Sequence, residues 1–168
     1  MNKILADMHT HTIASGHAYA TLTEMCKEAA NKGLEIYGIT EHSSGIPGTC
    51  ADIYFQNLRV VPRDLFGLDL RLGAEINIID YNGTLDFDQK YIDRLDFVIA
   101  GIHSVCYKFG SKEENTAAII NAIKNPNVNI ISHPDDGRCP LDYEALVQAA
   151  KEYHVLLEIN NNALRDKN

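Results

Sequence analysis

The stretch Lys3-Ile4-Leu5-Ala6-Asp7-Met8-His9-Thr10-His11 sets the pattern on which the rest of the chain is built. Its short apolar run is typical of a buried strand, and two histidines separated by one residue follow the strand end. Side chains of an extended chain alternate between two faces, so His9 and His11 point the same way. Two imidazoles on one side of a strand end are typical of a two-point metal clamp.

Short apolar runs and helical stretches then alternate along the chain. Strands are expected at residues 3–7, 35–40, 70–79, 97–101, 128–132 and 155–160. The Asn82-Gly83 pair after the third strand predicts a tight turn and a small hairpin. Strands that alternate with helices are typical of a parallel sheet, so we predict an α/β fold of the βα-repeat barrel kind.

Helix-start signals support this reading. Thr21 with Glu24, and Ser111 with Glu114, have the spacing of a capping box, in which each side chain satisfies a free backbone N–H of the first turn. We therefore expect helices at about 21–33 and 111–124. A third helix, at about 142–153, is expected to begin at the N-cap Asp142.

Length and composition limit the class of protein. The chain has 168 residues, 45% of them hydrophobic, and a formal net charge of −8, which fits one globular domain over residues 1–168 and disfavours a basic nucleic-acid surface. The sequence contains neither a membrane-length apolar run nor a signal-peptide pattern. Four cysteines without CxxC spacing favour reduced thiols, so we expect a cytoplasmic location.

Six of the seven histidines follow expected strand ends, and one glutamate lies within the third strand: His9, His11, His17, His42, His103, His133 and Glu75. Catalytic groups of βα barrels gather at the carboxyl ends of the strands. Imidazole and carboxylate together are typical ligands of Zn²⁺, Mn²⁺ or Fe²⁺. A histidine at the other end of a strand, such as His154, is expected to be an ordinary loop residue.

Neighbouring polar residues leave alternatives open. Glu41 and Asp135 are expected either to orient ligands or to be solvated loop carboxylates. Arg59 and Arg63 precede the third strand and can steer a phosphate group, although surface arginines are an equally good reading. Tyr19 and Asn77 are expected to pack or to orient ligands.

These residues fall in ordered blocks that resemble the PHP (polymerase and histidinol phosphatase) superfamily, specifically its small stand-alone phosphatases. The matching blocks are Asp7-Met8-His9-Thr10-His11-Thr12, Ser15-Gly16-His17-Ala18-Tyr19, Ile39-Thr40-Glu41-His42, Gly73-Ala74-Glu75-Ile76-Asn77, Gly101-Ile102-His103-Ser104, Ser132-His133-Pro134 and Glu158-Ile159-Asn160-Asn161. A lone His-x-His would be weak support, but ordered blocks over nearly the whole chain are strong support.

The resemblance implies a distorted (β/α)7 TIM-like barrel, here without its last βα unit, and two to three divalent ions, zinc first and manganese or iron as alternatives. It places His9, His11 and Glu75 at one ion, Glu75, His103 and His133 at a second, and His17 and His42 at a third. The family's Asp-x-His pair after a seventh strand is missing. We therefore expect the second position to be the best occupied and the third to be weak or empty unless a neighbouring chain helps to fill it. We also expect a partner molecule, such as a second copy in a homo-oligomer, or a disordered tail to cover the open barrel edge.

The resemblance also implies an activity: hydrolysis of a small phosphate monoester by a hydroxide that the metals activate, with His9, His11, Glu75, His103 and His133 as the catalytic set. Two alternatives are a non-catalytic accessory PHP module that binds metal, and a metal-dependent amidohydrolase. The second usually needs a bridging lysine at a strand end, and none is evident here.

Overall fold

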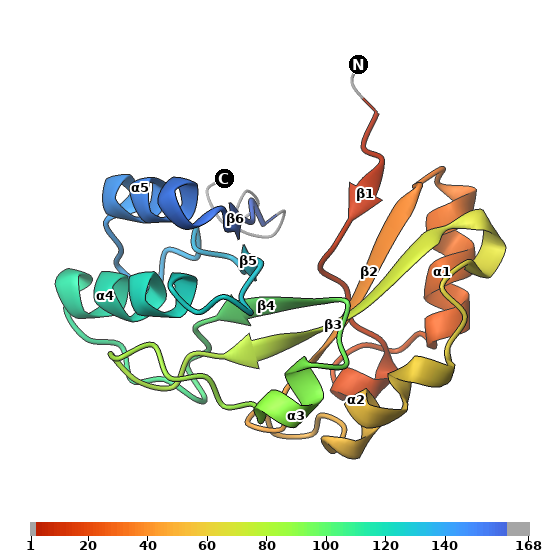
Figure 1. Ribbon diagram of the computed structural model, residues 1–168, viewed down its shortest axis with the longest axis horizontal. Helices are drawn as coiled ribbons and strands as arrows, with labels where there is room; N and C mark the ends of the chain where they lie inside the picture. Colours follow the sequence, from red (N-terminus) through yellow and green to blue (C-terminus); the bar gives the residue numbers. More distant parts are fainter. Residues whose placement is uncertain (1–2, 161–168) are drawn as a thin grey trace. The chain divides into compact units, whose positions relative to one another are not determined.

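The computed structural model describes residues 3–160, and these form two compact units (Figure 1). Unit 1 comprises the chain up to Glu75 together with Phe87–Phe97, and unit 2 comprises Ile76–Asp86 and the chain from Val98 onward. Each unit is described by itself below. The expectation of a single domain over residues 1–168 stays a prediction.

Parallel strands form the centre of unit 1. They are β1 (Ala6–Asp7), β2 (Ile36–His42) and β3 (Asp69–Asn77), hydrogen-bonded in the order β1-β2-β3. Ile39, Leu70 and Leu72 are buried between the layers, as β-branched and apolar side chains favour in a covered sheet. The register pairs His42, the last residue of β2, with Glu75 of β3.

Helices accompany these strands in unit 1. They are η1 (Ile13–Ser15), α1 (Leu22–Asn31), α2 (Ile53–Asn57), η2 (Leu58–Val60), η3 (Leu65–Gly67) and α3 (Gln89–Ile92). The capping box expected at Thr21 and Glu24 is present at the start of α1. Phe55 of α2 is fully buried, and its ring lies 4.8 Å from that of Phe87.

Unit 2 repeats the alternation of strands and helices. From Val98 on it contains β4 (Phe97–Gly101), then α4 (Lys112–Ile123), β5 (Ile130–Ile131), α5 (Tyr143–Tyr153) and β6 (Leu156–Leu157). These strands are parallel in the order β4-β5-β6, and α4 packs on α5 (Figure 1). Ser111 caps α4 through the expected capping box, and Asp142 caps α5.

The predicted elements are confirmed, although β1, β5 and β6 span only two residues each. β5 spans two residues, yet the N–H groups of Asn129 and Ser132 still donate to carbonyls of β4, so the ladder extends past the regular strand. The hairpin at Asn82-Gly83 is present, with Gly83 at φ 77° and an antiparallel bridge between Ile78 and Leu85. The short helices of residues 53–67 lack an apolar period and were not predicted. Among the described residues, no helix has the length and apolarity needed to cross a bilayer.

Candidate metal centre

The His-x-His pair behaves as the strand geometry predicts. β1 ends at Asp7, and the two following histidines turn their rings together, with the Nε2 atoms of His9 and His11 3.2 Å apart. Both nitrogens face the carboxylate of Glu75: Nε2 of His9 lies 3.0 Å, and Nε2 of His11 3.3 Å, from its Oε2 atom. The two histidines thus meet a glutamate that lies 64 or more positions further along the sequence of unit 1.

A third imidazole reaches the same oxygen. His42 and Glu75 are neighbours in the β2–β3 register, and Nδ1 of His42 lies 3.0 Å from Oε2 of Glu75. The Glu75 side chain is only 1% exposed, so its charge is withdrawn from water. Such burial is costly unless a positive partner compensates the carboxylate. Three imidazoles around a buried carboxylate are therefore a donor set that suits a cation.

The spacing of these donor atoms fits a metal ion. Ligand atoms held at about 2.0–2.1 Å around a tetrahedral Zn²⁺ lie about 3.3 Å from one another. The separations within the group of His9, His11 and Glu75 run from 3.0 to 3.3 Å. The three residues present their ligand atoms as one face of such a tetrahedron, so the group fits the ion that the donor chemistry implies.

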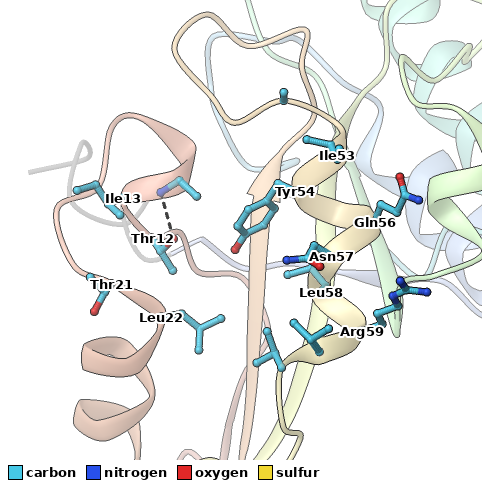
Figure 2. Close-up of a pocket in the computed structure, with 14 residues that line it drawn as sticks. Thr12, Ile13, Thr21, Leu22, Ile53, Tyr54, Gln56, Asn57, Leu58 and Arg59 are labelled. Carbon is cyan, nitrogen blue, oxygen red and sulfur yellow. Dashed lines mark hydrogen bonds between the residues drawn. The ribbon is translucent and has the colours of Figure 1, made fainter.

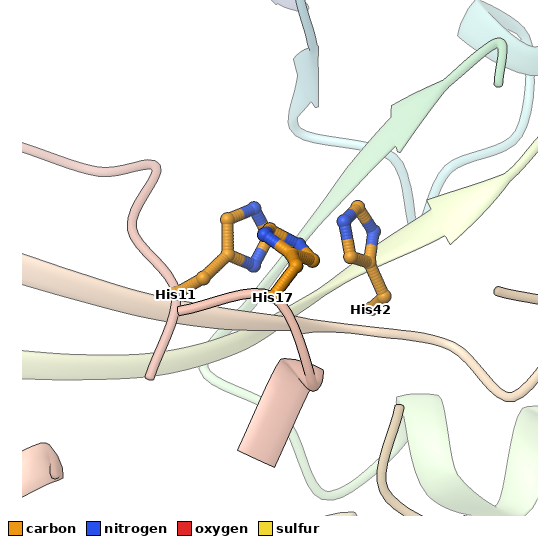
Figure 3. Close-up of side chains that lie close together, drawn as sticks. All are labelled: His11, His17 and His42. Atoms are coloured by element: carbon orange, nitrogen blue, oxygen red, sulfur yellow. The ribbon is translucent and has the colours of Figure 1, made fainter. Parts of the chain in front are cut away.

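His17 joins this cluster from a tight loop. It follows η1 and Gly16, whose φ of 76° is left-handed, and a Cβ there would meet the carbonyl oxygen of Gly48 at 2.2 Å. Its ring lies 4.9 Å from that of His11 and 5.0 Å from that of His42 (Figure 3). One nitrogen of each of these three rings lies within 4.8 Å of the others, so they form a second possible ligand group.

Glu41 is buried behind the cluster. It is 0% exposed and accepts hydrogen bonds from the N–H and hydroxyl of Thr12 and from the hydroxyl of Ser15. The same hydroxyl group of Ser15 lies 3.0 Å from Nδ1 of His11. Burial, together with the charge of Glu41, raises the pKa of the Tyr54 phenol, whose oxygen is 3.5 Å away. Glu41 is therefore a buried, hydrogen-bonded carboxylate and not a solvated one.

Unit 2 holds the remaining two strand-end histidines. The Nε2 atoms of His103 and His133 are 3.3 Å apart, again the separation of two ligands on one ion. Nδ1 of His103 is 2.7 Å from the side-chain oxygen of Asn77. His133 has a φ of 33°, which an L-residue rarely adopts, and its N–H donates to Glu158 at 2.6 Å. A strained backbone at a histidine is typical of a functional position.

The two predicted phosphate-steering arginines differ in their surroundings. Nε of Arg63 donates to Asp96 at 2.8 Å, and its Nη1 donates to two backbone carbonyls. The guanidinium is therefore engaged in hydrogen bonds within unit 1. Arg59 is exposed on η2 and lines a pocket of about 710 Å³ formed with η1, the start of α1 and α2 (Figure 2). Substrate binding by Arg59 and Arg63 stays a prediction.

The other polar residues singled out from the sequence have simpler roles. Tyr19 is 92% exposed, so the expectation that its side chain packs in the fold is wrong. His154 is exposed and ends α5 in the left-handed conformation, so it is the ordinary loop residue that was expected. One oxygen of Asp135 accepts the N–H of Asn160 at 3.2 Å. Sequence reasoning missed Ser15, which contacts His11, and Asp86, whose carboxylate accepts hydrogen bonds from Asn77. A hydroxyl or carboxylate in a loop has no spacing that points to a distant residue.

Comparison with known proteins identifies relatives that are named probable phosphatases. A probable phosphatase of Acetivibrio thermocellus is 48% identical over 161 residues, and the match covers 96% of this chain and 67% of the relative. A probable phosphatase of Caldicellulosiruptor saccharolyticus is 50% identical over 155 residues, and the match covers 92% of this chain and 65% of the relative. The chain thus spans about two thirds of the length of these relatives.

Solved structures show the same fold at low sequence identity. The histidinol phosphate phosphatase of Lactococcus lactis, complexed with zinc, L-histidinol and phosphate, superposes with a TM-score of 0.60 at 21% identity, covering 92% of this chain and 72% of that one. A putative histidinol phosphatase of Listeria monocytogenes superposes with a TM-score of 0.62 at 16% identity, covering 93% and 82%. The family model of the PHP domain matches residues 7–164. The chain belongs to the PHP domain family.

Proposed function

We propose that the chain carries the metal-binding site of a phosphoesterase that hydrolyses a small phosphate monoester. The observation that carries the proposal is the meeting of three imidazole nitrogens, from His9, His11 and His42, within 3.3 Å of one oxygen of the buried Glu75. Relatives named probable phosphatases, and a fold shared with a phosphatase that contains zinc and phosphate, support the choice of reaction.

The proposed metal ligands are the seven residues predicted from the sequence. Unit 1 supplies His9, His11, His17, His42 and Glu75, and unit 2 supplies His103 and His133. Two to three ions are proposed, zinc first, with manganese or iron as alternatives. When bound, divalent ions supply Lewis acidity and lower the pKa of a bound water to near neutrality.

The residues of the chain contribute positioning and charge. Glu75 holds a negative charge among the imidazoles of His9, His11 and His42, which raises the affinity of the site for cations. Arg59, exposed at the rim of its pocket, is proposed to attract the dianionic phosphate. Self-association and a cytoplasmic location stay predictions.

The test compares hydrolysis of an aryl phosphate with that of an aryl amide by the purified chain and by a full-length relative, together with elemental analysis. We expect bound zinc, manganese or iron and phosphatase activity in the relative. His9→Asn should lose metal and activity, whereas His154→Asn, a matched change outside the site at a left-handed position that asparagine tolerates, should lose neither. Amidase activity alone, or metal without any hydrolysis, would overturn the phosphoesterase assignment.

A further inference from the structure

Two histidines of the proposed ligand set, one in each unit, are each held by a chain of hydrogen bonds that ends on a carboxylate. One chain runs from Glu41 through Ser15 to His11, and the other from Asp86 through Asn77 to His103. We infer that Ser15 and Asn77 are positioning residues that select the tautomer of these two histidines and so keep each Nε2 lone pair available to a cation. The inference rests on the proposed metal-binding function and adds how two of the proposed ligands are kept in the tautomer that can bind a cation.

The directions of the hydrogen bonds in the first chain of hydrogen bonds follow from the hydrogen-bonding capacity of a hydroxyl. Ser15 has one hydrogen to donate and two lone pairs. It donates its hydrogen to Glu41, because an ionised carboxylate can only accept. It accepts the backbone N–H of His42 at 3.2 Å. The remaining contact, 3.0 Å from Nδ1 of His11, must therefore be a hydrogen bond that His11 donates.

This assignment decides the state of the His11 ring. A neutral imidazole carries one N–H, so a hydrogen on Nδ1 leaves a lone pair on Nε2. That nitrogen lies 3.3 Å from Oε2 of Glu75 and 3.2 Å from Nε2 of His9. Ser15 is 1% exposed, so water does not compete for these bonds. The buried Glu41 thus presents His11 as a ligand without contacting the cation site itself.

The second chain of hydrogen bonds selects the same histidine tautomer with an amide in place of the hydroxyl. Asp86 accepts the backbone N–H of Asn77 at 2.9 Å and its side-chain NH₂ at 2.6 Å. Because the carboxylate only accepts, the amide nitrogen must face it and the amide oxygen must face away. That oxygen lies 2.7 Å from Nδ1 of His103, so His103 donates there. Its Nε2 lone pair then faces Nε2 of His133 at 3.3 Å.

The experiment reads tautomers directly in the metal-free chain. Ring ¹⁵N chemical shifts are recorded at about pH 8, above the reference pKa of histidine near 6.5. We expect His11 and His103 as single Nδ1–H tautomers. Ser15→Ala should convert His11 to a mixture and leave His103 unchanged. Asp86→Asn should convert His103 to a mixture of tautomers, because the side-chain amide of Asn77 is then no longer held in one orientation. The His11 tautomer should stay unchanged.

A matched control separates positioning from simple support of a buried charge. Thr12 is 2% exposed and donates to the same Glu41 carboxylate, but it has no contact with Nδ1 of His11. Thr12→Val should leave the His11 tautomer in place and change zinc affinity less than threefold. Ser15→Ala should weaken zinc binding by about 10- to 100-fold. Ser15→Thr, which keeps the hydroxyl, should restore most of it and guards against a folding defect in the alanine variant.

The inference is overturned if His11 and His103 are already tautomer mixtures in the unmodified chain. It is also overturned if Ser15→Ala and Thr12→Val change the His11 ring and zinc affinity equally. Failure of the proposed function is a different result: a chain that binds no zinc and hydrolyses no phosphate ester would refute the function. The tautomers of the two rings, read without metal, would still decide the positioning role.

Discussion

His42 and Glu75 are register partners at the ends of two neighbouring parallel strands, and Nδ1 of His42 lies 3.0 Å from Oε2 of Glu75. Adjacent strands run about 4.8 Å apart, so side chains at one level of the sheet meet directly. The pairing brings an imidazole and a carboxylate 33 residues apart in the chain into contact without any loop rearrangement. A site built on strand ends is therefore positioned by the sheet register.

Glu75→Gln should remove at least one equivalent of bound metal. The amide keeps the shape of the side chain but lacks the negative charge that a cation among neutral imidazoles requires. Elemental analysis of the purified variant measures the loss. Glu35→Gln, an exposed glutamate of the same unit, is the control and should keep its metal. Full metal content in Glu75→Gln would show that the carboxylate is not a ligand.

Gly16→Ala should destabilise unit 1 and weaken the contribution of His17 to metal binding. Its φ of 76° and the 2.2 Å approach of a Cβ to Gly48 combine conformational strain with a clash. Gly67 is the matched control, because its φ of 80° carries the same strain while a Cβ there meets nothing within 4 Å. We expect Gly67→Ala to cost about 1 kcal/mol and Gly16→Ala about 3 kcal/mol. Urea denaturation measures both, and equal losses would exclude the clash.

Alkaline pH should destabilise the chain through Tyr37. Burial raises the pKa of Tyr37 from its usual value near 10 to about 12, so the folded state keeps the phenol proton that the unfolded state releases. The stabilisation is complete below pH 10 and is lost as pH rises through about 12, a change of up to about 3 kcal/mol. Tyr37→Phe should flatten this part of the stability curve, and Tyr19→Phe, at an exposed position, should not. Parallel curves for both variants would contradict the prediction.

Ser111→Ala should lower the free energy of unfolding by about 1 kcal/mol. The hydroxyl of Ser111 accepts the N–H of Glu114, and the Glu114 carboxylate accepts the N–H of Ser111, so alanine leaves one helix donor without its side-chain partner. Thermal or urea unfolding measures the difference. Ser104→Ala, an exposed loop serine of the same unit, serves as the control. An unchanged midpoint in the Ser111 variant would show that α4 does not depend on its cap.

Some elements could be read from the sequence because their signals are local. The capping boxes at Thr21 and Ser111 and the turn at Asn82-Gly83 depend on residues within four positions of one another, and the structure contains all three. The helices of residues 53–67 could not be read in this way. They follow the packing of side chains such as Phe55, which contacts Phe87 far along the chain.

The sequence by itself determined the alternation of strands and helices, the family, and the imidazoles that follow strand ends, because each depends on residue type and short-range spacing. Only the tertiary structure decided which atoms meet. It brings Glu75 beside three imidazoles of its unit, buries Glu41, and engages Arg63 with Asp96. It also gives Ser15 and Asn77 their histidine partners. Hydrogen-bond direction and burial arise from contacts between distant segments, and no spacing along the chain specifies them.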